Sequence, residues 1–118
     1  MLENFAQTAA VDARNTYGVT IPWEMILELV LQLIEDCFPD EESFVQSAKS
    51  PNMLQKVAFN IVARRVTGIK RRGTLVSLRN VVFDNAAALT DNELAAGYNE
   101  AKAVFGTVVS EDEVGDEE

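Results

Sequence analysis

The chain has 118 residues, of which 47% are hydrophobic and 25% charged, and it contains one cysteine and no histidine. This composition is typical of one soluble globular domain, and the length suffices for a hydrophobic core without disulfide bonds or a metal. The absence of histidine excludes Ser-His-Asp and Cys-His catalytic centres and most zinc sites. The net charge of −9 is acidic overall, but it is distributed unevenly along the chain.

The first predicted helix covers residues 2–16. Leu2, Phe5, Ala9 and Ala13 recur at helical spacing along one face. Gly18 follows at a position where glycine commonly ends a helix. We therefore expect an amphipathic helix that packs through a face of small and apolar side chains.

The second predicted helix, within residues 21–38, is almost entirely apolar. Thr20 and Pro22 are expected to open it, and Pro39 to end it. A membrane span is disfavoured, because the carboxylate of Glu28 near the bilayer centre would cost about 2.5 kcal/mol or more. The chain also begins without the basic and apolar regions of a secretory signal, so we expect a cytoplasmic protein that does not contact a membrane.

The polar residues of this second helix fall on one narrow stripe, since residues four apart lie almost above one another. A helix that is apolar over the rest of its circumference has to be covered on several sides. The pattern predicts the central helix of a small bundle. Its short neighbours leave room for an uncovered part, so we also expect a contact surface for a second copy or another protein at Trp23, Leu27, Val30, Leu31 and Ile34.

Asp40 is expected to cap a short third helix, with acidic residues in its first turn. Ser50-Pro51 resembles a second cap and predicts the start of a fourth helix, which should end at Gly68 or Gly73. Its apolar face is expected to be Leu54, Val57, Ala58, Ile61 and Val62, and Lys56, Asn60 and Arg64 should lie opposite.

Residues 74–89 combine features of a helix and of a strand. Their apolar spacing favours a helix, although the content of Thr and Val would also suit a strand. The clearest local signal follows, a T-x-x-E capping box at Thr90 and Glu93, with Leu89 and Leu94 as its hydrophobic staple. We expect this last helix to carry Leu94, Tyr98, Ala101 and Phe105 on one side and to stop at Gly106.

The predicted architecture is therefore all-α: a small orthogonal bundle of five or six short helices around the central apolar helix. Residues 1–109 form the single domain. Residues 110–118, SEDEVGDEE, contain six acids, and we expect them to be a disordered acidic tail because they hold too little apolar surface to fold.

Charge divides the chain into three parts. Residues 1–42 carry a net charge of −8, residues 43–83 contain eight bases and no acid, and residues 84–118 carry −9. The basic part could pair within its own fold, meet acidic surfaces of other copies in a head-to-tail assembly, or contact nucleic-acid phosphates. The residues proposed for phosphate or an acidic partner are Arg64, Arg65, Lys70, Arg71 and Arg72.

Nucleic-acid binding is the alternative to a protein partner. The net negative charge opposes it, and the basic segment of residues 63–74, ARRVTGIKRRGT, contains no aromatic side chain to stack on bases.

The sequence contains no nucleotide-binding glycine motif and no calcium loop, and Cys37 alone cannot hold a metal. We expect no catalytic residues, cofactor, metal or small-molecule substrate. The sequence thus favours a non-catalytic interaction or assembly protein whose partner is itself or another protein.

Overall fold

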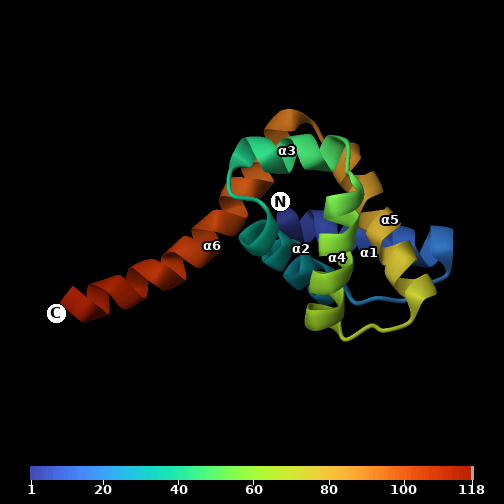
Figure 1. Ribbon diagram of the computed structural model, residues 1–118, viewed down its shortest axis with the longest axis horizontal. Coiled ribbons are helices and arrows are strands. Elements are labelled where there is room, and N and C mark those ends of the chain that lie inside the picture. The colour runs from blue at the N-terminus through green and yellow to red at the C-terminus, as the bar shows by residue number, and fades with distance from the viewer. Residues whose placement is uncertain (118) are drawn as a thin grey trace.

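The computed structural model describes the backbone of residues 1–117 and the side chains of residues 1–104. The described backbone is helical, with no strand, and it forms an orthogonal bundle (Figure 1). The helices are α1 (Leu2–Tyr17), α2 (Trp23–Cys37), α3 (Glu41–Lys49), α4 (Met53–Thr67), α5 (Arg72–Ala87) and α6 (Asp91–Glu117). The prediction of an all-α bundle is confirmed.

Helix α2 lies at the centre, packed against α1, α4 and α6. Ile26, Leu29 and Ile34 are completely buried, whereas Glu24 and Glu28 on the polar stripe are exposed. Burying most of the circumference of one helix requires neighbours on several sides, and α2 has them. The predicted role of this segment as the organising helix is therefore confirmed.

The local signals for helix ends are mostly correct. Gly18 ends α1 with φ of +67°, a conformation that glycine adopts without a steric penalty. The Asp40 carboxylate accepts a hydrogen bond from the Ser43 backbone N–H and so caps α3. The Thr90–Glu93 capping box forms, since each residue's backbone N–H donates to the side chain of the other.

Two predicted helix starts are wrong. The N-cap of α2 is Pro22 and has no side-chain cap, so Thr20 does not play that part. The N-cap of α4 is Asn52, which forms a reciprocal capping box with Gln55, whereas Ser50 is the C-cap of α3. Asn52 caps α4 because its side-chain amide oxygen accepts a hydrogen bond of 3.1 Å from the backbone N–H of Gln55.

The predicted inner face of α4 is also wrong, except at Val62, which is buried as expected. The buried residues are Phe59, Val62 and Ala63, whereas Leu54 and Ile61 of the predicted apolar face are exposed. Helix α4 has two apolar stripes, and its neighbours α2 and α5 cover the one that carries the phenylalanine. The larger side chain gains more from burial, which accounts for the choice.

Residues 74–89 are helical, as favoured by their spacing, and α5 buries Leu75, Leu78 and Val82. The last helix begins as predicted, with Leu94 and Ala101 buried. It continues past Gly106 to Glu117, so that glycine does not end it. The predicted acidic tail, residues 110–118, lies outside the residues whose side chains are described, and its disorder stays a prediction.

Two of the contacts that fix helix α6 to the bundle involve α1 and the turn after α2. The Tyr98 hydroxyl donates a buried hydrogen bond of 3.1 Å to the Phe38 carbonyl and so joins α6 to the turn after α2. At Gly97, α6 approaches α1 so closely that an added Cβ would lie 3.3 Å from Cδ2 of Leu2. These contacts set the position of α6 against both α1 and α2.

Candidate functional site

The predicted contact surface on α2 is largely inside the molecule. Val30 and Ile34 are buried, and Ile34 has no exposed surface. Trp23, Leu27 and Leu31 are half-buried and pack against the same hydrophobic core. Val30 and Ile34 are therefore not surface residues of this chain, and the neighbouring helices already cover most of the face proposed for a partner.

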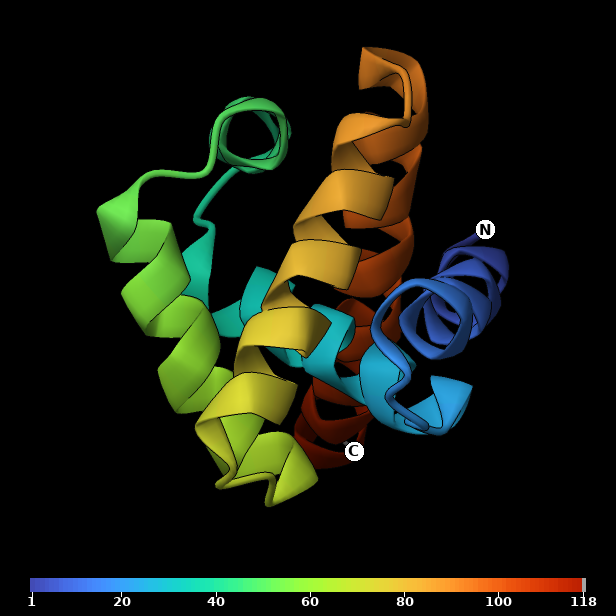
Figure 2. The ribbon, with the colours of Figure 1, turned by 90° about the vertical axis from the view of Figure 1, so that its right-hand side faces the viewer.

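The uncovered apolar surface lies on α4 instead. Met53, Leu54, Val57 and Ile61 form one stripe along its outer face, and Leu54 and Ile61 are 76% and 61% exposed. Figure 2 shows α4, in green, at the edge of the bundle with no helix on its outer side. We call these four residues the α4 stripe. Contiguous apolar patches on a protein surface commonly mark interaction sites.

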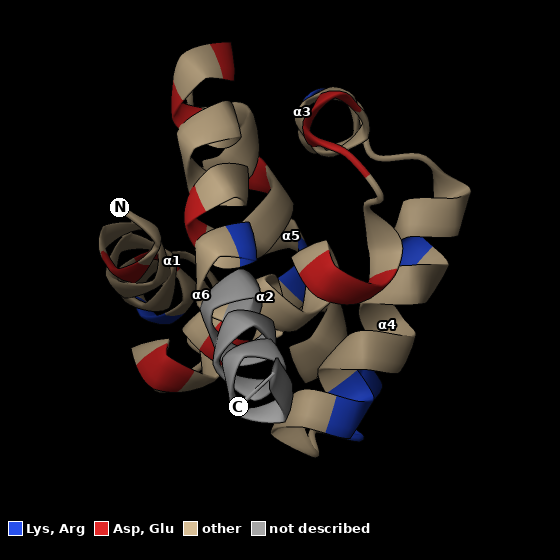
Figure 3. Cartoon of the chain, turned by 90° about the vertical axis from the view of Figure 1, so that its left-hand side faces the viewer, with Lys and Arg blue, Asp and Glu red and all other residues tan. Residues whose placement is uncertain are grey.

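The basic residues gather at the C-terminal end of this stripe and in the turn that follows. Arg64 and Arg65 are in the last turn of α4, and Lys70, Arg71 and Arg72 lead into α5. All five are exposed. Lys and Arg positions are visible at this end of α4 in Figure 3. The structure thus brings the predicted basic segment together with an apolar surface that the sequence did not indicate.

Arg65 differs from the other four bases because it binds Asp36 of α2 in an ion pair. This hydrogen bond from the Arg65 guanidinium, with a second from Gln32, lowers the pKa of Asp36 below its ordinary value. Among the described residues, no carboxylate lies within ion-pair distance of Arg64, Lys70, Arg71 or Arg72. Internal pairing therefore accounts for Arg65, but not for most of the basic segment.

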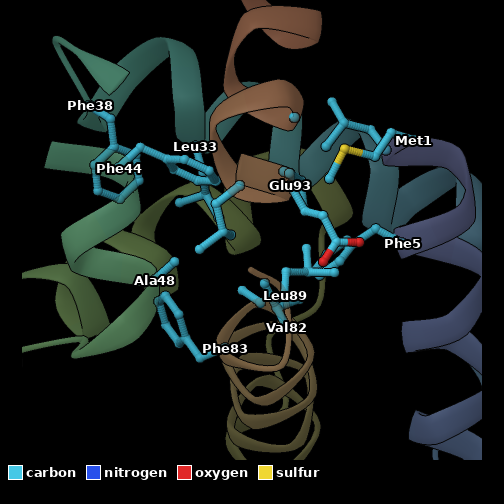
Figure 4. Close-up of a pocket in the computed structure, with 15 residues that line it drawn as sticks. Met1, Phe5, Leu33, Phe38, Phe44, Ala48, Val82, Phe83, Leu89 and Glu93 are labelled. Carbon is cyan, nitrogen blue, oxygen red and sulfur yellow. The ribbon is translucent and has the colours of Figure 1, made fainter. Parts of the chain in front are cut away.

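A small apolar cavity of about 50 Å³ lies within the bundle (Figure 4). Phe44 and Leu33 are on one side of it, with Met1 and Phe5 on the other. Drug-sized ligands occupy pockets of roughly 300–1,000 Å³, so this cavity is a gap in packing and not a cofactor site. The one ionisable side chain in its lining, that of Glu93, is engaged in the capping box with Thr90.

The described residues contain no group of three or more Cys, Asp and Glu side chains placed to hold a metal ion. Cys37 is half-buried, and burial together with the nearby Asp36 charge raises the pKa of its thiol. A thiol with a raised pKa is mostly protonated at neutral pH, which makes it a poor nucleophile.

Within the part of the chain that the structure describes, no helix combines the length and apolar character needed to cross a bilayer. The chain matches no protein-family model, no curated protein and no solved structure.

Proposed function

We propose that this is a non-catalytic assembly protein whose copies associate head to tail. The α4 stripe of one copy, with the basic residues beside it, receives the acidic C-terminal segment 104–118 of the next. The observation that carries this proposal is the exposed apolar stripe of α4, which lies in the part of the chain that contains bases and no acid.

Burial of the α4 stripe would supply the hydrophobic part of this interface. Removing apolar surface from water stabilises a contact by about 25 cal/mol per Å², and large side chains at helical spacing form a continuous strip for an apolar counterpart. The buried apolar residues on the opposite side of α4 already anchor the helix, whereas Leu54 and Ile61 of the α4 stripe bury little surface within a single copy.

Charge supplies the second part. The stripe is followed by Arg64, which has no carboxylate partner among the described residues, so its counterpart should combine apolar side chains with carboxylates. Segment 104–118 has this composition, because Val104, Val108 and Val109 precede six acids. Val104, the last residue whose side chain is described, is exposed and available for such a contact. Each copy therefore carries both halves of a heterologous interface, which forms rings or open filaments.

Sedimentation velocity of the full chain tests the proposal. We expect the sedimentation coefficient to rise with protein concentration and Ile61→Asp to abolish the rise, since a buried unpaired carboxylate is unfavourable. Val11→Asp is the matched control, because Val11 is also an exposed apolar helix residue (53%, against 61% for Ile61) but lies on α1. A chain that is monomeric at every concentration would overturn the proposal, and so would equal effects of the two variants.

The acidic half of the interface is tested separately. The triple variant Glu111→Gln, Asp112→Asn and Glu113→Gln removes three charges without shortening the chain. We expect it to weaken association, and we expect wild-type association to weaken as salt shortens the Debye length from about 10 Å at 0.1 M to about 3 Å at 1 M. Association that is unaffected by both changes would contradict the role of the C-terminal segment.

A second candidate function, nucleic-acid binding, is favoured by the exposed Lys70, Arg71 and Arg72, which have no carboxylate partner among the described residues. Binding to DNA or RNA that falls steeply with salt, and that Arg71→Ala weakens, would support it. The absence of a complex at low salt would exclude it.

Both functions suit a cytoplasmic location, which we propose because Cys37 has no second cysteine with which to form an internal disulfide.

A further inference from the structure

A second pocket, separate from the apolar cavity, lies between α4 and α5 and has a volume of about 380 Å³. Its lining residues are Asn60 and Arg64 of α4 with Arg72, Leu75, Val76 and Arg79 of α5. Three of these six side chains are arginines. The size falls within the range of about 300–1,000 Å³ that is ordinary for small-ligand sites.

The positive charge of this pocket is not neutralised among the described residues. None of the described ion pairs includes Arg64, Arg72 or Arg79. Residues 43–83, which include every residue of the pocket lining, contain no Asp or Glu. Like charges around one pocket repel one another, and a bound anion would relieve that repulsion.

Two further polar groups lie at the pocket. Asn60 also lines the pocket, and its side-chain oxygen is buried without a hydrogen-bond partner, so this oxygen is not held by a contact within the bundle. Arg72 is the first residue of α5, a helix of 16 residues with no side-chain cap and no acid in its first turn. The free N–H groups and the positive dipole end of α5 therefore lie at the edge of the pocket.

We propose that the α4–α5 pocket binds a phosphate monoester group, held by the guanidinium groups of Arg64, Arg72 and Arg79. A phosphate monoester carries nearly two negative charges and three terminal oxygens at neutral pH. Guanidinium groups from two helices match those oxygens through paired N–H donors. The site does not require head-to-tail assembly, although it shares Arg64 and Arg72 with the basic residues beside the α4 stripe.

Titration of the ¹⁵N-labelled full chain with inorganic phosphate, at constant ionic strength and neutral pH, tests the site by NMR. We expect saturable shifts at the backbone amides of Arg72, Gly73 and Thr74 and at the Asn60 side chain. Arg79→Gln should weaken binding at least about tenfold, the effect of losing one hydrogen bond to a charged group. Arg14→Gln is the matched control, since Arg14 is an exposed arginine on α1. The Arg14→Gln variant should bind phosphate with the same affinity as the wild type.

Several outcomes would overturn the proposal. Shifts that do not saturate, or that sodium chloride reproduces, would show screening without a site. Equal affinities of Arg79→Gln and Arg14→Gln would place the ion elsewhere. Dimethyl phosphate, which imitates the nucleic-acid backbone, should bind more weakly than inorganic phosphate. Equal or tighter binding of dimethyl phosphate would contradict a monoester site. If Arg79→Gln disturbs the fold, as shifts throughout the spectrum would show, Arg72→Gln is used in its place because Arg72 is exposed. The expected loss of phosphate affinity is the same.

Discussion

Helices α2 and α4 are both 15 residues long and both rich in apolar side chains, yet they differ in how far the other helices cover them. Helix α2 is surrounded by α1, α4 and α6, whereas α4 is covered on one side and leaves its second apolar stripe in solvent. Apolar content alone therefore does not distinguish a core helix from a binding surface. The number of neighbouring helices makes the difference.

The largest expected effect compares core and surface isoleucines. Ile34→Ala on α2 should lower the free energy of unfolding by about 2–5 kcal/mol, because it leaves a cavity at a fully buried position. Ile61→Ala on the α4 stripe should change it by less than about 0.5 kcal/mol. Urea denaturation, at a concentration where the chain is monomeric, measures both. Similar losses would mean that the α4 stripe is covered within one copy.

A smaller effect distinguishes how the two helices begin. Asn52→Ala removes the side-chain cap of α4 and should lower the free energy of unfolding by about 1 kcal/mol. Thr20→Ala is the control, because α2 starts without a side-chain cap and is stabilised by burial. Thermal or urea unfolding of both variants and the wild type measures these changes in the free energy of unfolding. If Thr20→Ala costs as much as Asn52→Ala, the start of α2 depends on a local cap after all.

The smallest effect concerns the ion pair that joins the two helices, Asp36 of α2 with Arg65 of α4. Because the folded pKa of Asp36 is lowered, its contribution is complete above the unfolded pKa of about 3.9 and is lost as the pH falls through the folded value. The pair is partly exposed, so Asp36→Asn should cost at most about 1 kcal/mol near neutral pH and almost nothing in strong acid. Unfolding curves of both proteins at several pH values measure this, and a difference that does not depend on pH would contradict it.

The sequence predicted those features that depend on neighbouring residues. Gly18, Asp40 and the Thr90–Glu93 box act within a few positions of themselves, and each forms as expected. The central place of α2 was predictable too, since a helix apolar on most sides has few alternatives to burial.

The face that α4 presents to solvent was not predictable in the same way. Its two apolar stripes, one with Phe59 and one with Ile61, have the same helical periodicity, and only the positions of α2 and α5 select between them. The α4–α5 pocket was missed for a related reason. Asn60 and Arg79 are separated by a turn and a helix start, and no local pattern indicates that they line one space.

The contact at Gly97 limits how this protein could be engineered. Replacing a helical glycine with alanine usually stabilises the helix by about 1 kcal/mol. At Gly97 the added methyl group would lie 3.3 Å from Cδ2 of Leu2 on α1, so the substitution gains its full benefit only when the buried Leu2 side chain shifts or is replaced by one of another shape. The two positions therefore have to be redesigned as a pair, even though they lie near opposite ends of the described chain.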